Sequence, residues 1–312
     1  MSRRIALVTD STAYLPEEAV DRHGIAVVPL SVVVGDEVLA DGVEISPKDV
    51  AEALRARQRV TTSRPSPETF AAAYRAAAEA GAEAVVSVHI SAELSGTVEA
   101  ARLAAAEAPL PVEVVDSRLV GMALGHCVLA AAEAIGSGAG GRPQGGLDGA
   151  GGRDGGAGGR DGAGGRDAAE LAADVAAAVA DRAERISGFF YVDTLEYLRR
   201  GGRIGAAQAL LGSALSVKPL LHLAGGRIEP LEKVRTASKA IARLEEIAVE
   251  RAGADEVDIT VHHLAAADRA EPLAERLRAR VPGLRELTVL EVGAVIGAHV
   301  GPGLLAVVVA PR

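Results

Sequence analysis

The sequence is poor in aromatic residues, and it carries no excess of basic charge. Phe, Tyr and Trp together make up 2% of the 312 residues, and Trp is absent. Few rings are therefore available to stack nucleic-acid bases. The formal net charge is −9, whereas a phosphate backbone requires a basic surface. These two features argue against nucleic-acid binding.

The sequence also lacks cysteine pairs and long apolar runs. Cys127 is the only cysteine, so no intrachain disulfide can form and nothing indicates an oxidising compartment. Its apolar neighbours predict a buried, unreactive thiol on a helix. No apolar run approaches the roughly 20 residues of a membrane span, and no signal-peptide core follows Met1. We therefore expect a cytoplasmic protein with no stable membrane insertion.

No nucleotide-binding motif is present. The phosphate-binding loop G-x-x-x-x-G-K-[ST] is missing, and no group of aspartates has the spacing of a magnesium site. Phosphoryl transfer by this chain alone is therefore not expected, nor is a resident cofactor.

The residues that are present predict two α/β domains. Hydrophobic residues make up 49% of the chain, and its length exceeds that of a usual single domain. Apolar runs followed by Thr, Asp or Ser predict strands of a mainly parallel sheet at 5–8, 85–90, 112–115 and 189–192. Strands at 259–262, 287–292 and 304–309 predict a second, smaller α/β sandwich. Helices are expected at 67–80, 98–106, 168–185, 237–251 and 271–280, with short helices beginning near Pro16 and Pro47.

A glycine-rich stretch divides the chain. Residues 136–167 repeat Gly-Gly-Arg-Asp three times and contain almost no apolar residues. Such a composition does not offset the entropy cost of ordering, so a solvated loop is expected. The predicted domains are thus 1–135 and 168–312, separated by the insertion 136–167, with a boundary near Asp167.

Three short clusters of small polar residues and glycine suggest a binding site. They are segments 61–66 (TTSRPS), 94–97 (LSGT) and 297–303 (GAHVGPG), each beside a strongly apolar strand or helix. Together they offer neutral hydrogen-bond donors at the mouth of an apolar pocket. This pattern favours a site for an amphipathic acid.

These clusters belong to a longer series of motifs. In chain order the others are VTDST at 8–12, VDS at 115–117, DTLEYL at 193–198, GGRI at 201–204, KP at 218–219 and KVRT at 233–236. In order and spacing the chain resembles the DegV family of bacterial fatty-acid-binding proteins, apart from the stretch 136–167. The resemblance implies a non-enzymatic carrier that binds a long-chain fatty acid between two α/β domains. It also implies that a separate ATP-dependent fatty acid kinase converts the bound acid to an acyl phosphate.

The resemblance further implies roles for single residues. Ligand binding is implied for Thr62, Ser63, Ser95, Gly96, Thr97, His299 and Gly301. Arg203 is implied to serve a phosphorylated head group, and Arg235 to lie on the face that docks on the kinase.

Structural roles for the same residues stay open from the sequence alone. Thr62 or Ser66 is suited to cap the helix from Pro67, Ser66 being the better candidate. Ser95 is suited to cap the following helix. His299 lies among glycines in an expected loop. Arg203 and Arg235 have the pattern of solvated charges.

Two other functions compete. A serine hydrolase would use Ser95, His299 and an aspartate such as Asp116, although segment 94–97 is not a G-x-S-x-G elbow. A regulatory scaffold would carry no lipid at all.

Overall fold

A four-stranded parallel sheet forms the centre of the N-terminal part of the chain. The computed structural model describes residues 5–137, 167–210 and 218–312, so most of the predicted glycine-rich loop lies outside the described residues. The strand order is β2-β1-β6-β7. The strands are β1 (Ile5–Asp10), β2 (Ile25–Val28), β6 (Ala84–His89) and β7 (Val112–Asp116). Burial on both faces explains the continuous apolar runs of β1 and β6.

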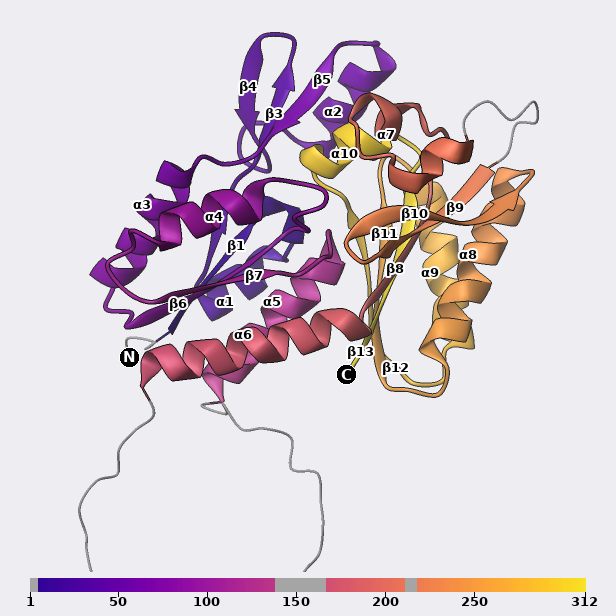
Figure 1. Ribbon diagram of the computed structural model, residues 1–312. Coiled ribbons are helices and arrows are strands. Elements are labelled where there is room, and N and C mark those ends of the chain that lie inside the picture. The colour runs from indigo at the N-terminus through magenta and orange to yellow at the C-terminus, as the bar shows by residue number, and fades with distance from the viewer. Residues whose placement is uncertain (1–4, 138–166, 211–217) are drawn as a thin grey trace, which may run out of the picture.

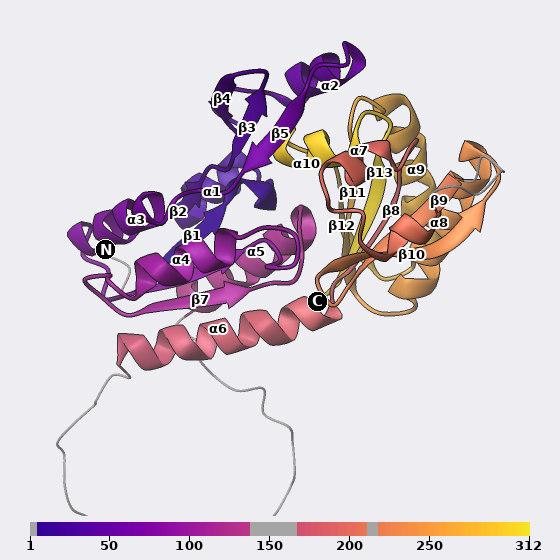
Figure 2. The same ribbon diagram turned by 45° about the horizontal axis from the view of Figure 1, so that its top comes forward.

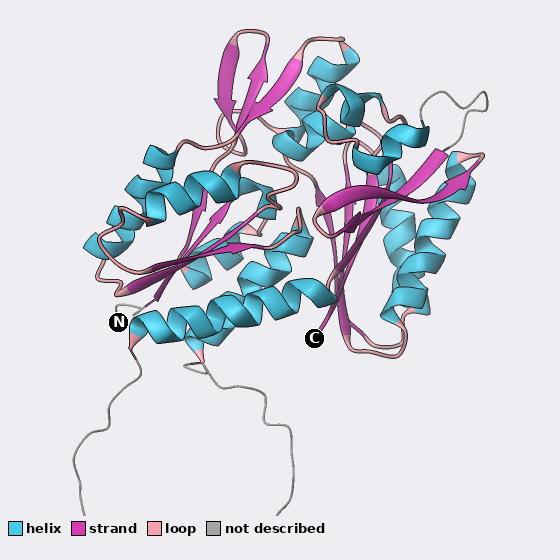
Figure 3. Cartoon of the chain, viewed as in Figure 1, coloured by secondary structure: helices cyan, strands magenta, loops and turns pink. Residues whose placement is uncertain are grey.

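Helices cover both faces of this sheet (Figures 1 and 3). One face packs against α3 (Pro67–Glu79) and α4 (Thr97–Ala105). The other packs against α5 (Met122–Gly136) and α6 (Ala168–Arg185), while α1 (Glu17–His23) lies beside β2. The contacting helix residues are mainly Ala and Val, which allow the helices to approach the sheet closely.

Helix α6 belongs by its packing to this first sheet. Its buried residues Ala168, Ala172, Val175 and Val179 share one core with β1 and β6. The boundary predicted near Asp167 assigns α6 to the C-terminal part. The packing favours a boundary after Arg185 instead.

A small antiparallel sheet projects from the N-terminal part. It consists of β3 (Ser31–Val34), β4 (Glu37–Ala40) and β5 (Val60–Ser63) in the order β4-β3-β5, accompanied by α2 (Pro47–Arg55). The helix has Pro47 in its first turn, as predicted, and begins with a capping box between Ser46 and Asp49. The strands were not predicted, because most of their residues are half-buried or exposed and do not form the continuous apolar run of a strand buried on both faces.

The C-terminal part contains a six-stranded mixed sheet in the order β10-β9-β8-β13-β11-β12. Its strands are β8 (Ser187–Tyr191), β9 (Lys218–Ala224), β10 (Arg227–Val234), β11 (Val257–His263), β12 (Leu284–Glu291) and β13 (Leu305–Pro311). Only β11 and β12 pair in parallel. The run 189–192 was predicted as part of the mainly parallel sheet, and this is wrong, because β8 lies between two antiparallel neighbours. The second sheet was also predicted to be the smaller one, but it has six strands, whereas the parallel sheet of the N-terminal part has four.

One face of the second sheet is covered by α8 (Ala237–Ala252) and α9 (Ala267–Arg280). The opposite face turns toward the N-terminal part (Figures 1 and 2). Around it lie α7 (Glu196–Arg200), the 3-10 helix η2 (Gly205–Leu210) and α10 (Ala294–Val300), while the short 3-10 helix η1 (Ser11–Ala13) follows β1.

All five long helices predicted from the sequence are present, and the mixed α/β class is confirmed. The prediction of a loop around His299 is wrong, since this residue lies in α10. Cys127 is fully buried in α5, and burial raises the pKa of its thiol to about 12, as an unreactive core position requires.

Candidate functional site

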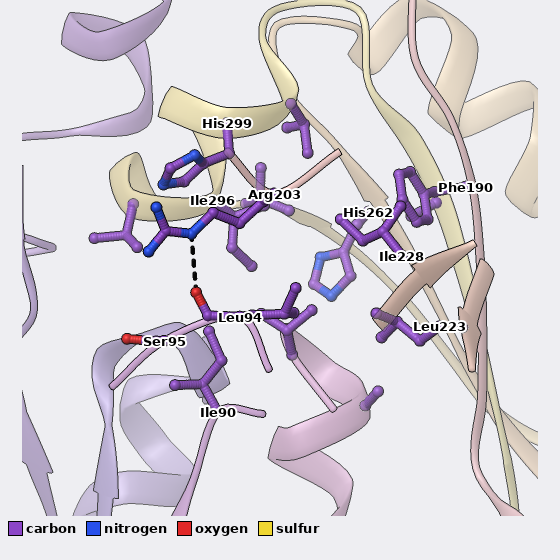
Figure 4. Close-up of a pocket in the computed structure, with 18 of the residues that line it drawn as sticks. Ile90, Leu94, Ser95, Phe190, Arg203, Leu223, Ile228, His262, Ile296 and His299 are labelled. Carbon is purple, nitrogen blue, oxygen red and sulfur yellow. Dashed lines mark hydrogen bonds between the residues drawn. The ribbon is translucent and has the colours of Figure 1, made fainter. Parts of the chain in front are cut away.

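A cavity of about 270 Å³ lies between the two parts of the chain. Its apolar wall receives Ile90 and Leu94 from the segment after β6, and Phe190, Leu223 and Ile228 from the second sheet. Figure 4 shows these side chains around one common space, with the polar groups of Ser95, Arg203 and His299 gathered at one end. The cavity thus has a mainly apolar body and a polar end.

Thr62 and His299 meet at the polar end. A hydrogen bond of 2.8 Å joins Thr62 Oγ1 and His299 Nε2, although 237 positions separate them in the chain. Thr62 is presented by β5 and His299 by α10, and both line the cavity. Two of the three predicted clusters are therefore adjacent in space.

The imidazole of His299 is neutral at physiological pH. Burial and, to a smaller extent, the positive charge of Arg203 lower the pKa of His299 to about 4. Nδ1 is buried without a hydrogen-bond partner among the described residues, and the ring lies against Gly201, where a β carbon would overlap it. His299 can therefore exchange hydrogen bonds with a ligand but brings no positive charge to it.

Arg203 supplies a positive charge at this end of the cavity. Its Nε donates to the Leu94 carbonyl at 3.0 Å, and its Nη1 donates to the Gly201 carbonyl at 2.7 Å. These bonds fix a half-buried guanidinium at the cavity wall. The planar guanidinium is suited to pair with a carboxylate or a phosphate.

Ser95 and Thr97 differ in their exposure to the cavity. Ser95 lines it, and its hydroxyl bonds to the Thr97 hydroxyl at 2.8 Å. Thr97 is fully buried and does not line the cavity. The N-cap of α4 is Gly96 and no side chain caps this helix, so the capping role considered for Ser95 is wrong. Ser66 does cap α3, as predicted.

Of the remaining predicted residues, some line the cavity and others do not. Ser63 and Gly96 line the cavity, whereas Gly301 does not. Gly301 has a left-handed φ of 73°, and a β carbon there would overlap the ring of Tyr197. Arg235 is exposed and outside the cavity, directly after β10 and before Thr236, the cap of α8.

Arg64 and His262 also line the cavity but were not predicted as ligand-binding. Arg64 is exposed and packs over Gly96, where its guanidinium occupies the space of a β carbon. Arg64 lies within the segment TTSRPS, which was predicted to form part of the site, and this position could have indicated it. His262 accepts from the Met122 N–H at 3.0 Å, and burial lowers its pKa to about 4.

The residues of the competing hydrolase do not form a triad. Ser95 bonds to Thr97 and His299 bonds to Thr62. Asp116 accepts from the backbone N–H groups of Ala92 and Arg118. Each of the three is thus bonded to groups outside the proposed triad.

Fold and cavity define an α/β protein whose two parts enclose an apolar space with a polar end. The model of the family described as "Uncharacterised protein, DegV family" matches residues 4–141 and 166–312. The unmatched residues 142–165 fall within the glycine-rich stretch. The chain belongs to the DegV family.

Similar proteins cover the whole chain. A DegV domain-containing protein of Streptomyces coelicolor is 61% identical over 312 residues, with 100% of both chains covered. A structure described as fatty acid binding of a DegV family protein from Thermus thermophilus has a TM-score of 0.84 and 34% identity, covering 99% of this chain and 100% of its own. DegV of Bacillus subtilis, described as a fatty acid binding protein, has a TM-score of 0.82 and 32% identity, with 100% of both chains covered.

Within the described ranges, no helix is both long and apolar enough to cross a bilayer.

Proposed function

We propose that this chain binds a long-chain fatty acid, with the acyl chain in the cavity and the carboxyl group at its polar end. The observation that carries the proposal is the combination of an apolar body with Thr62, Ser95, Arg203 and His299 at one end. The fatty-acid binding described for the Thermus thermophilus and Bacillus subtilis structures supports it.

The two halves of the site would contribute differently to binding. Each buried CH₂ contributes roughly 0.8 kcal/mol, so the apolar wall supplies most of the affinity. At the polar end, the hydroxyls of Thr62 and Ser95 and the imidazole of His299 would hydrogen-bond the carboxyl group. These groups fix which end of the ligand faces outward.

We further propose that the chain is a carrier and not itself an enzyme. It would present the carboxyl group to a separate ATP-dependent fatty acid kinase in the cytoplasm and retain the acyl phosphate. Arg203 at the polar end would contact the phosphoryl group, and exposed Arg235 would lie on the docking face.

A threonine pair tests the head-group site. Thr62→Val keeps the side-chain volume but removes the donor, so affinity for palmitate should fall about ten- to a hundred-fold, equivalent to ~1–3 kcal/mol. Thr61→Val is the matched control, because Thr61 is exposed on the same strand and does not line the cavity. Binding is measured by titration after delipidation. Equal affinities of both variants would refute the assignment of Thr62.

Two further measurements separate the alternatives. Mass spectrometry of the natively purified protein should detect fatty acid, whereas a scaffold would carry none. A fluorophosphonate probe should leave Ser95 unlabelled. Covalent labelling would instead support a hydrolase.

A further inference from the structure

The first turn of α10 is held by side chains from the N-terminal part of the chain. Its N-cap, Gly293, has no side chain to cap it. The N–H groups of Ala294 and Val295 donate to Asp41 Oδ1 at 2.9 and 3.4 Å, and that of Ile296 donates to the Tyr14 hydroxyl at 3.2 Å. These partners lie 253 to 282 positions earlier in the chain. The three N–H groups of the first turn, those of Ala294, Val295 and Ile296, are thus bound by the N-terminal part.

Both carboxylate oxygens of Asp41 are held by hydrogen bonds. Its side chain is buried, and its second oxygen accepts from Ser11 Oγ at 2.8 Å. Ser11 Oγ in turn accepts from the Leu30 N–H at 3.1 Å, at the entry to β3. Burial raises the pKa of the Asp41 carboxyl, while the bonds from Ser11 and α10 lower it. A carboxylate that links a sheet to a helix N-terminus complements the helix dipole.

Apolar contacts hold the same helix against the small sheet and α2. Ala294, Val295 and Ala298 of α10 share a core with residues of β3 and α2. Tyr14 occupies the space in which a β carbon of Gly293 would lie. Figures 1 and 2 show α10 beside β5 and α2 in both views. The position of α10 is therefore set by elements that also position β5.

The far end of α10 carries His299, which bonds to Thr62 of β5. We propose that Asp41 is a positioning residue for the head-group site, because it fixes α10 so that His299 stays within hydrogen-bond distance of Thr62. The inference rests on the proposed fatty-acid binding for its effect on affinity. Asp41 itself does not line the cavity, so its effect on a ligand passes either through α10 or through Ser11 to Leu30, which does line it.

A double-mutant cycle tests this route. Asp41→Ala leaves two buried N–H groups without an acceptor and should weaken palmitate binding about ten-fold or more. Asp41→Asn keeps a carbonyl acceptor for α10 and should restore most of the affinity. In a His299→Ala background, Asp41→Ala should have almost no further effect, because nothing remains for it to position. Independent, multiplicative losses would overturn the proposal.

A second measurement needs no ligand. The ring resonances of His299, assigned with a His299→Asn variant, should shift in ligand-free Asp41→Ala. Asp167→Ala is the control, because it removes an aspartate cap from α6, far from α10, and should leave both the ring and palmitate affinity unchanged.

A third variant guards against misfolding of Asp41→Ala. In Gly293→Ala the added β carbon would push against Tyr14 and should displace α10 in the same way. If the parent protein bound no palmitate, the proposed function would fail while the resonance experiment still tested the positioning role. A His299 ring unchanged in both variants would overturn that role.

Discussion

Gly301 shows how a residue of the site region is selected by backbone geometry. Its left-handed φ of 73° strains any side chain, and the ring of Tyr197 fills the space for a β carbon. Gly301→Ala should therefore lower the free energy of unfolding by about 2–4 kcal/mol, the sum of strain and overpacking. Gly35→Ala should lower it by only about 1 kcal/mol, because Gly35 has a φ of 62° but no neighbour within 4 Å. Urea denaturation measures both, and equal losses would contradict the role of Tyr197.

Single residues of the site were predictable only in part. The sequence motifs predicted that Thr62, Ser95, Arg203 and His299 belong to the site, and all four line the cavity. Their mutual arrangement was not predictable, because Thr62 and His299 meet across 237 positions and no local pattern encodes such a pair. The roles of Asp41 and Tyr14 were missed for the same reason.

At the scale of elements, the glycine-rich stretch is expected to be dispensable. Deletion of residues 145–165 removes sequence with almost no apolar residues, and the family match also skips residues 142–165. The melting temperature and the amount of bound lipid should stay nearly unchanged. Differential scanning calorimetry and lipid extraction measure the two quantities. A loss of several degrees together with lost lipid would show that this stretch contributes to the cavity.

The long helices were predicted well, whereas the short helix α10 and the strands β3, β4, β5, β9 and β10 were not. Helix α6 was predicted with its observed bounds, because 18 residues of Ala-rich periodic sequence follow the cap Asp167. Helix α10 has only seven residues and is flanked by glycines, which is too short for periodicity to be visible. The direction of β8 could not be predicted either, since a buried apolar run is compatible with parallel or antiparallel neighbours.

At the scale of the whole molecule, buried neutral histidines should make the fold sensitive to acid. Burial lowers the pKa values of His126, His262 and His299 from 6.5 to about 4. Below pH 6.5 the unfolded chain binds more protons than the folded one, so stability falls as the pH decreases toward 4. At pH 5 each histidine should cost about 2 kcal/mol relative to pH 7.5.

Substitution tests this dependence. His126→Gln should remove about 2 kcal/mol of the stability loss between pH 7.5 and pH 5, as measured by urea denaturation. His23→Gln is the control for the loss of an imidazole, at the end of α1. An unchanged pH dependence in His126→Gln would contradict the assignment of a buried neutral ring.

The proposed presentation to a kinase predicts a separation of two functions. Arg235→Ala should keep its bound lipid but reduce association with the kinase, mainly through a slower association rate, because Arg235 is exposed and outside the cavity. Arg203→Ala should dock normally and fail in acyl phosphate formation. Arg102→Ala, an exposed cation on α4, controls for the loss of charge. Normal docking and turnover of Arg235→Ala would rule out the interface assignment.

The central place of β13 in the second sheet has a consequence for the order of assembly. This strand joins β8 to β11, so Tyr191 must find Leu305 across a long intervening chain before the sheet becomes continuous. Closing so long a loop is slow compared with forming helices or hairpins. Until β13 inserts, the cavity lacks Leu304, Ala306 and Val308 from its wall. We therefore expect a refolding chain to become able to retain a ligand only in its last and slowest step, well after most of its helices have formed.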